Sequence, residues 1–245
     1  MAREGILYGF HAAEEALKHQ SERINHVWTS SDPPARVRKI INEARKRRLP
    51  VQLVDSRALT RLAGSPHHQD IVIEVGPYRY YSQDQLLENV SDNSLFCILD
   101  EIQDVTNFAT LIRSAEGAGV QGIFVPERRT ALVTSVTSKL SAGALEHVRI
   151  ARAGNLARLI EKMQQNGIRV ICADASAAKL WYDADYSGPL AILVGNEHHG
   201  VRKLLKEKSD DLVRVPMIGK IQSLNVNVAA AILLYEAIRQ RQRMI

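Results

Sequence analysis

Residues 219–238 read GKIQSLNVNVAAAILLYEAI, and their order of polar and apolar side chains is unusual. The front half alternates in the way that is typical of a half-buried strand, whereas the rest is typical of a helix. No turn residue separates the two patterns. We expect a helix over about 223–243, with Ser223 as its N-cap and Leu224 as its first residue. Two interpretations stay open for the polar residues at the start of this apolar run: they only cap the helix, or they also face a ligand.

Helical spacing predicts which residues of this helix are buried. The expected apolar face consists of Leu224, Val228, Ala231, Ile232 and Tyr235. Asn225 and Asn227 fall on other faces of the first turn. They can therefore meet a ligand while the remainder of the helix packs into the core.

Six apolar segments typical of buried strands precede this helix. They are LFCILD (95–100), GIFVP (122–126), HVRIA (147–151), IRVICAD (168–174), LAILVGN (190–196) and LVRVP (212–216). Helical patterns separate them near 107–118, 133–141, 155–166 and 200–207. This alternation predicts an α/β domain with a parallel sheet covered on both faces. Ligands of such sheets bind beyond the carboxyl ends of the strands, so the residues after LFCILD, LAILVG and LVRVP are candidates for function.

The amino-terminal part predicts a smaller α/β domain over residues 1–76. We expect helices near 10–20, 35–48 and 56–63, and strands at 24–30, 51–55 and 71–75. The polar, turn-rich segment 77–93 is predicted to be a linker, and 94–245 the second domain.

The formal net charge of +5 permits a nucleic-acid partner, and the positive charge is concentrated at 35–48. This segment carries seven Lys and Arg residues against one Glu, and its apolar face would consist of Val37, Ile40, Ile41 and Ala44. Two interpretations stay open for the basic side chains: a solvated helix surface, or a patch that contacts phosphates.

Composition is that of an ordinary globular chain of 245 residues, 45% hydrophobic and 24% charged. Cys97 and Cys172 lie in apolar runs, so we expect buried thiols in a reducing compartment. No apolar stretch reaches the roughly 18 residues of a membrane helix. The amino terminus lacks the core of a signal peptide. These features favour a cytoplasmic protein without membrane contact.

Two patterns that suggest cofactor or metal binding are rejected. GAGVQG (117–122) matches a dinucleotide-binding fingerprint, but it follows a predicted helix and precedes a strand, so it is interpreted as a helix cap. His198 and His199 are adjacent and lack a third ligand at zinc spacing, so we expect no metal.

Polar residues also follow the first and fifth strands of the second domain. Thr106 can cap a helix that carries Asn107, Arg113 and Glu116, although Arg113 and Glu116 could simply form a surface ion pair. In LVGNEHHGV (193–201), Gly195 allows close approach of a ligand, and Glu197 is an acid at a strand end.

Taken together, three segments resemble the three motifs of the SpoU (TrmH-like) branch of the SPOUT RNA methyltransferases. Asn107 and Arg113 match the first motif, and Gly195, Glu197 and Gly200 match the second. The third motif, Pro-Met-x-Gly-x-x-x-Ser-Leu-Asn-Val-x-Val-Ala, is matched by residues 216–229. The segments YGFHAAEEAL and HHQDIVIEV resemble the substrate-binding domain of the same family, which is L30e-like.

The resemblance implies a fold and a reaction. The carboxyl-terminal SPOUT (α/β knot) domain would contain a deep trefoil knot, a rare exception among protein chains, and would form a homodimer. The reaction would be S-adenosylmethionine-dependent methylation of a ribose 2'-oxygen, on a guanosine of 23S rRNA. The alternatives are a tRNA 2'-O-methyltransferase and a non-catalytic RNA-binding assembly factor.

The resemblance also implies site residues. The catalytic set would be Asn107, Arg113, Glu197, Ser223 and Asn225. Cofactor binding would involve Leu193, Val194, Gly195, Asn196, Pro216, Met217, Ile218, Gly219, Ser223 and Leu224. RNA binding would involve Arg36, Arg45, Lys46, Arg47, Arg48 and His68. The residue types of Tyr78, Arg79, Tyr80 and Tyr81 are also able to stack on bases and reach phosphates, and the alternative for this segment is packing within the linker.

The sequence departs from the family pattern at four positions. Val105 replaces a proline, Ala109 a glycine, Asn227 a serine, and Asp70 the glycine of His-Gln-Gly. The methyl group of Ala109 is expected to narrow a close approach to RNA. The departures leave the substrate nucleotide and the catalytic competence open.

Overall fold

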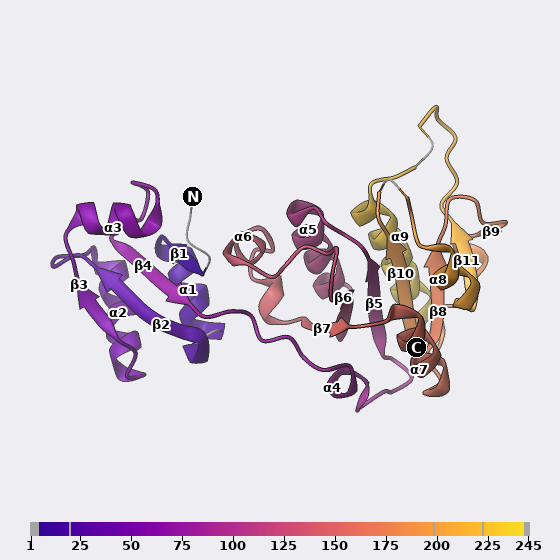
Figure 1. The fold of residues 1–245 in the computed structure, drawn as a ribbon, viewed down its shortest axis with the longest axis horizontal. Coiled ribbons are helices and arrows are strands. Elements are labelled where there is room, and N and C mark those ends of the chain that lie inside the picture. Colours follow the sequence, from indigo (N-terminus) through magenta and orange to yellow (C-terminus); the bar gives the residue numbers. More distant parts are fainter. Residues whose placement is uncertain (1–4, 20, 198, 222, 243–245) are drawn as a thin grey trace. The chain divides into compact units, whose positions relative to one another are not determined.

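The computed structural model describes residues 5–19, 21–197, 199–221 and 223–242. Contacts divide the chain into two compact units (Figure 1). The first comprises the residues up to Arg79 together with Val133–Lys139, and the second comprises the others from Tyr80 onward. The domain boundaries expected from the sequence stay a prediction.

The first unit contains a mixed sheet with the strand order β1-β4-β2-β3, in which only the β2–β3 pair is parallel. Its elements are β1 (Ile6–Tyr8), α1 (Phe10–His19), η1 (Ser21–Arg23), β2 (Ile24–Thr29), α2 (Ala35–Lys46), β3 (Val51–Leu53), α3 (Ser56–Ala63) and β4 (Ile71–Val75). Helices α1 and α2 pack in one apolar cluster, and α3 packs in another. The predicted apolar face of α2 is confirmed, because Val37, Ile40, Ile41 and Ala44 are all buried.

A tight turn before β4 contains His68, Gln69 and Asp70. The His68 ring is buried, and its Nδ1 accepts a hydrogen bond from the backbone N–H of Asp70 at 3.1 Å. Gln69 and Asp70 both have positive φ, +50° and +62°. Asp70 therefore occupies a left-handed position that glycine adopts without strain, at the place where the resemblance expects glycine.

Within the described residues, the second unit contains a parallel sheet of seven strands in the order β7-β6-β5-β10-β8-β11-β9. Its strands are β5 (Leu95–Asp100), β6 (Gly122–Pro126), β7 (Arg149–Ala153), β8 (Arg169–Ala173), β9 (Lys179–Leu180), β10 (Leu190–Gly195) and β11 (Asp211–Arg214). The predicted parallel sheet is confirmed, whereas the short edge strand β9 has no counterpart in the prediction.

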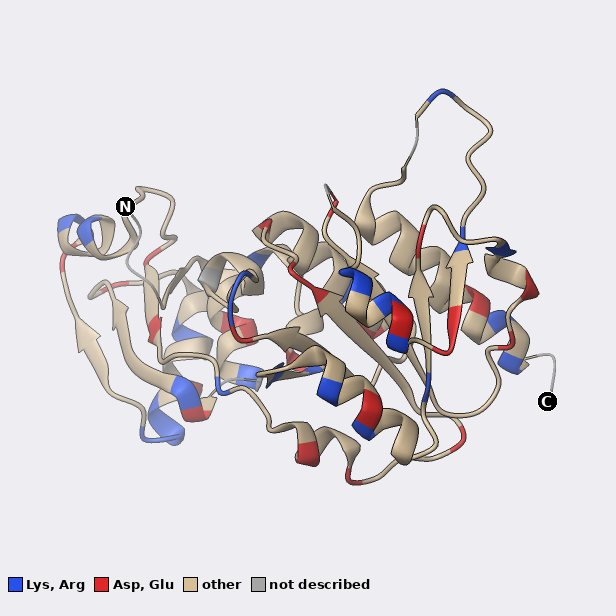
Figure 2. Cartoon of the chain, turned by 45° about the vertical axis from the view of Figure 1, so that its right-hand side comes forward, with Lys and Arg blue, Asp and Glu red and all other residues tan. Residues whose placement is uncertain are grey.

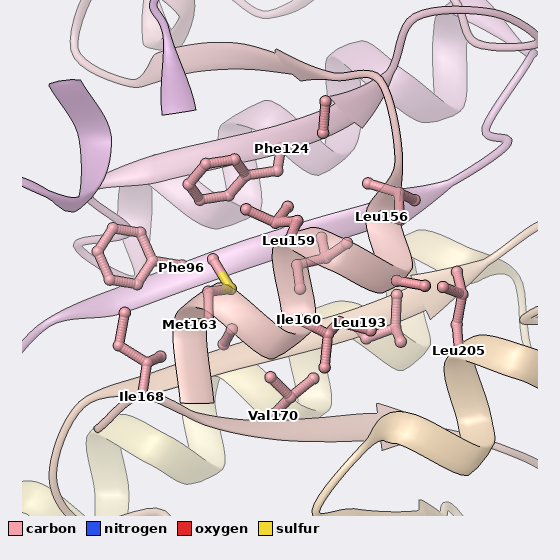
Figure 3. Close-up of a cluster of buried hydrophobic side chains, with 14 of the residues drawn as sticks. Phe96, Phe124, Leu156, Leu159, Ile160, Met163, Ile168, Val170, Leu193 and Leu205 are labelled. Carbon is pink, nitrogen blue, oxygen red and sulfur yellow. The ribbon is translucent and has the colours of Figure 1, made fainter. Parts of the chain in front are cut away.

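Helices cover both faces of this sheet. The helices of this unit are α4 (Gln83–Leu87), α5 (Val105–Gly117), α7 (Leu156–Gln165), α8 (Lys203–Lys208) and α9 (Val226–Gln242), with 3-10 turns η2 (Ala144–Glu146) and η3 (Trp181–Asp183). Helix α6 (Ser135–Leu140) belongs, except for its last residue, to the first unit. On one face, Leu159 and Met163 of α7 pack with Phe96 and Phe124 (Figure 3). Alternate side chains of β5 point to the opposite face. There, α9 contacts both α5 and β10.

The start and the buried face of α9 differ from the prediction. The helix begins at Val226, and Asn225 caps it, since its Oδ1 accepts the backbone N–H of Asn227 at 2.9 Å. The expected apolar face is wrong: Val228 is 47% exposed and Tyr235 is 52% exposed. The buried residues are instead Val226, Asn227, Ala230, Leu233, Leu234, Glu236 and Ala237. The apolar side chains of α9 point in nearly all directions around the helix axis, so their spacing alone could not predict which face is buried.

Helix α5 differs from the prediction in two details and agrees in a third. Asp104, and not Thr106, caps it by accepting the N–H of Asn107 at 2.7 Å. Ala109 is fully buried, so its methyl group faces the core and the predicted effect on RNA approach is wrong. The cap interpretation of GAGVQG is confirmed, because α5 ends at Gly117 and Gly119 has φ of +70°. No helix in the described part of the chain has the length and apolar character to cross a membrane.

Candidate functional site

A cavity of about 380 Å³ opens at the carboxyl edge of the seven-stranded sheet. Segments that follow β8, β10 and β11 line it, together with the first turns of α9. Parallel strands deliver their carboxyl ends to the same edge, which is why four segments distant in sequence meet there. Its apolar wall contains Val194, Val213, Val226 and Leu233.

The cavity contains part of the set predicted to bind a cofactor. Val194, Gly195, Asn196, Met217, Ser223 and Leu224 line it. Leu193 is buried in β10, and Ile218 is 99% exposed in the loop between β11 and α9 (Figure 1). Pro216 and Gly219 are not among the lining residues.

Sequence reasoning missed the segment after β8, where Asp174 and Ser176 line the cavity. The same strand-end rule could have found them, because IRVICAD is a buried strand that ends in an acid. Asp174 pairs with Lys206 at 2.9 Å. Burial alone raises the pKa of Asp174, but hydrogen bonds from Ser176 and Lys206 outweigh it and hold the pKa below its usual value. The cavity therefore carries an ionised carboxylate beside a lysine.

The backbone around Gly195 leaves no space for a side chain at this position. A Cβ atom at this position would lie 2.3 Å from the backbone of Gly200 and Val201. The turn is closed by a hydrogen bond from the N–H of Gly200 to the carbonyl of Asn196, at 2.7 Å. The predicted close approach at Gly195 is therefore between Gly195 and the backbone of this turn, and residues of the turn line the cavity.

Gly195→Ala is expected to displace the turn at 196–200 and to lower the free energy of unfolding by about 2 kcal/mol, as overpacking does. Because the turn lines the cavity, affinity for any ligand of the cavity should fall as well. Urea unfolding and calorimetry measure the two effects. Gly154→Ala is the matched control, since its Cβ would approach nothing closer than 3.5 Å. Equal behaviour of the two variants would contradict this explanation.

Four polar side chains form a connected cluster beside the cavity: Asn107, Glu197, Asn225 and Asn227. The Asn107 amide donates a short hydrogen bond to Oε1 of Glu197. Asn225 Nδ2 donates to the same Oε1 at 3.1 Å and to Asn107 Oδ1 at 3.2 Å. Asn227 Nδ2 donates to Asn107 Oδ1 at 2.9 Å. Three of the five predicted catalytic residues thus converge, and Asn227 joins them.

The other two predicted catalytic residues lie elsewhere. Ser223 lines the cavity and is exposed. Arg113 is exposed on α5 and has no hydrogen-bond or ion-pair partner among the residues that the structure describes, so the surface pair with Glu116 is not formed. Arg113 is six positions after Asn107, which corresponds to about 9 Å along the helix and a different face. One chain therefore does not bring Arg113 to the cluster.

An ion pair holds the turn that follows β10 against the end of β5. Asp100 is 1% exposed and accepts two hydrogen bonds from Arg202, from its backbone N–H and from Nε, both at 2.9 Å. Nη2 of Arg202 lies 2.7 Å from Oδ1 of Asp100 in the ion pair. Hydrogen bonding to Asp100 raises the pKa of Arg202. Asn196 donates to the carbonyl of Glu101, whose φ is +59°, at 3.0 Å. These contacts fix the geometry around Glu197.

The predicted RNA-binding residues differ in their availability. Arg45, Lys46, Arg47 and Arg48 are all exposed. Arg47 in addition donates a hydrogen bond to the carbonyl of Leu17 at 2.6 Å. Arg36 lies over the Phe10 ring at 5.3 Å. Some helices carry both acidic and basic residues (Figure 2).

The tyrosines of YRYY stack on arginines of their own unit, with Tyr78 on Arg23, Tyr80 on Arg152 and Tyr81 on Arg149. These contacts favour the packing interpretation for the three rings, and their contact with RNA stays a prediction. Cys97 and Cys172 are buried free thiols, as predicted, and burial raises the pKa of each to about 12. Among the described ranges, which exclude His198, no three His, Cys, Asp or Glu residues are grouped as metal ligands.

Comparison with known proteins gives matches over nearly the whole chain. The SpoU rRNA methylase family matches residues 94–235, and the family of RNA 2'-O ribose methyltransferase substrate-binding domains matches residues 6–81. The 23S rRNA (guanosine-2'-O-)-methyltransferase RlmB of Shewanella oneidensis is 37% identical, covering 99% of this chain and 100% of that protein. RlmB of Pseudomonas aeruginosa is 36% identical, with 96% of each chain covered. A solved AdoMet-bound rRNA methyltransferase from Sinorhizobium meliloti has a TM-score of 0.80 and 26% identity, covering 97% of this chain and 87% of that chain.

Proposed function

Because this chain belongs to the SpoU rRNA methylase family, we propose that it transfers a methyl group from S-adenosylmethionine to the ribose 2'-oxygen of a guanosine in 23S rRNA. The observation that carries the proposal is the amide-carboxylate cluster at the rim of the strand-end cavity. The relatives named for this reaction cover nearly the full chain.

The residues present fit S-adenosylmethionine. The cavity volume of about 380 Å³ lies within the range of about 300–1,000 Å³ that is usual for ligand pockets. Its apolar wall of valine and leucine suits a purine, and Asp174 with Lys206 offers polar partners for the charged end or the sugar. We propose that Val194, Met217 and Leu224 hold the cofactor with them. Ile218, Pro216 and Gly219 of the same motif remain proposed contacts through their loop.

Bound S-adenosylmethionine supplies an electrophilic methyl group on a sulfonium centre. The protein's part is to align a ribose hydroxyl and to receive its proton. Oε1 of Glu197 is occupied by two amide donors, and among the described residues Oε2 has no partner. Oε2 is therefore the proposed acceptor of the hydroxyl proton as the oxygen attacks. Alignment of reacting groups supplies much of the acceleration in such reactions.

Arg113 is proposed to stabilise negative charge on the RNA. Arginine stays protonated in proteins, so its role is electrostatic and not that of a base. Its planar guanidinium suits a phosphate. Its exposure and its distance from the cluster support an action on a second site of a homodimer.

A homodimer through the carboxyl-terminal unit is part of the proposal. Val228 and Tyr235 project from α9 as exposed apolar side chains, which a partner subunit would cover. The proposed location is the cytoplasm, where ribosomal RNA is present and where thiols such as Cys97 and Cys172 stay reduced. The first unit, with exposed Arg45, Lys46 and Arg48, is the proposed RNA-binding unit.

The proposal is tested with purified protein, radiolabelled S-adenosylmethionine and two RNA substrates, unmodified 23S rRNA and unmodified tRNA. Labelled 2'-O-methylguanosine in digests of the 23S rRNA is expected. Label in tRNA alone would favour the tRNA alternative. RNA binding without label, and without binding of S-adenosylhomocysteine, would favour a non-catalytic assembly factor.

A further inference from the structure

Asn227 contacts the polar cluster through Asn107. It is the second residue of α9, is 8% exposed, and directs Nδ2 at Asn107 Oδ1. At this position the resemblance expects serine. The side chain contacts a residue of the proposed catalytic set without belonging to that set.

The orientation of every amide in the cluster follows from two groups whose roles are fixed. The backbone N–H of Asn227 can only donate, so the Asn225 atom that faces it is the oxygen, and Asn225 Nδ2 points to Glu197 and Asn107. The carboxylate oxygens of Glu197 accept hydrogen bonds, so Asn107 presents Nδ2 to Glu197. Asn107 Oδ1 then faces Asn225 and Asn227, and Asn227 must offer a donor.

Stability does not explain an asparagine at this place. Its Oδ1 is buried and has no hydrogen-bond partner among the described residues. A buried acceptor without a partner costs free energy, and a smaller or apolar residue would not carry this cost. A group that lowers stability beside a proposed active site points to a functional reason.

We propose that Asn227 is a positioning residue for methyl transfer: it holds the Asn107 amide with its nitrogen toward Glu197, and so leaves Glu197 Oε2 for the ribose hydroxyl. This inference rests on the proposed function. A serine hydroxyl would end roughly 1.3 Å short of the amide nitrogen, the length of one C–N bond. From the same backbone it would leave Asn225 and Glu197 to orient the Asn107 amide without the third contact.

The sharpest test is Asn227→Asp, which keeps the shape but replaces the donor with an acceptor. The carboxylate would repel Asn107 Oδ1, the amide of Asn107 would turn over, and its oxygen would face Glu197. We expect kcat at pH 8 to fall about tenfold or more, with the Kd of S-adenosylhomocysteine nearly unchanged, since loss of alignment affects the chemical step. When the pH falls through the titration of the introduced carboxyl group, its proton can be donated to Asn107. The ratio of variant to wild-type kcat should therefore rise.

Asn227→Ser tests the same idea without a charge. It should lower kcat while the midpoint of thermal unfolding stays equal or rises, because the buried acceptor is removed. Asn93→Asp, at an exposed position outside the cluster, is the matched control and should follow the wild-type pH profile.

The inference is overturned if Asn227→Asp has wild-type kcat, or if its loss of kcat does not change with pH. It is also overturned if kcat, cofactor affinity and thermal stability fall together, which would indicate a purely structural role. With an active wild-type enzyme, these outcomes leave the proposed function intact. If the wild-type protein methylated no RNA, both the proposed function and the inference on Asn227 would be wrong.

Discussion

Arg113→Ala is expected to lower the single-turnover rate of methyl transfer by about a thousandfold, the upper range for loss of one preorganised charge contact. The Kd of S-adenosylhomocysteine should stay unchanged, because Arg113 does not line the cavity. Rapid-quench kinetics and calorimetry measure these two quantities. Arg158→Ala is the matched control, since Arg158 is likewise exposed on a helix of the same unit.

Arg113→Lys separates two forms of the electrostatic role. A lysine retains the charge but lacks the two-pronged guanidinium, so partial activity is expected if charge dominates and almost none if a forked contact to phosphate is needed. Near-normal turnover of Arg113→Ala would contradict any role for this residue in the reaction.

Mixing two inactive variants tests whether Arg113 acts across the proposed dimer. In dimers that combine an Arg113→Ala chain with a Glu197→Ala chain, one of the two sites would have both residues intact. Random assembly would then restore about a quarter of the wild-type activity, given a twofold symmetric dimer. No restoration, with mixed dimers shown to form, would place Arg113 and Glu197 in the same chain's site.

Arg202→Ala is expected to have the largest effect on stability, about 3 kcal/mol, because it leaves the buried Asp100 carboxylate without its cation. The turn at 196–200 would lose its tie to β5, so binding of S-adenosylhomocysteine should weaken as well. Urea unfolding with calorimetry checks both.

The double variant Asp100→Leu with Arg202→Met supplies the control for this ion pair. Replacing both partners with apolar groups avoids an unpaired buried charge, so the double variant should be more stable than Arg202→Ala. If the two were equally unstable, loss of packing and not of the ion pair would explain the effect.

The sheet of the second unit could be predicted from the sequence because each strand has a continuous apolar run. LFCILD and GIFVP, for example, form β5 and β6 with the predicted bounds. Strand β9 has two residues and no such signal. The prediction of the buried face of α9 was wrong for the opposite reason. Apolar residues occupy most of the circumference of this helix, so tertiary packing determines which of them are buried. The trefoil knot stays a prediction.

The site was only partly predictable. The three motifs identified the family, which is confirmed, and they named Asn107, Glu197 and Asn225, which the fold brings together. Asn227 was noted as a departure, but its bond to Asn107 depends on the packing of α9 against α5, which no local pattern encodes. Conversely, His68 was expected to meet RNA and is buried in a turn. The catalytic roles themselves stay predictions.

The central claim is that the cluster at the sheet edge delivers a methyl group to a ribose 2'-oxygen. It is tested most directly with an RNA fragment in which the modified guanosine, once mapped, is replaced by 2'-deoxyguanosine. The account predicts that the wild-type protein transfers no methyl group to this fragment but methylates the unmodified fragment stoichiometrically. Undiminished transfer to the deoxy fragment would show that the methyl group goes to another atom, and would contradict the account.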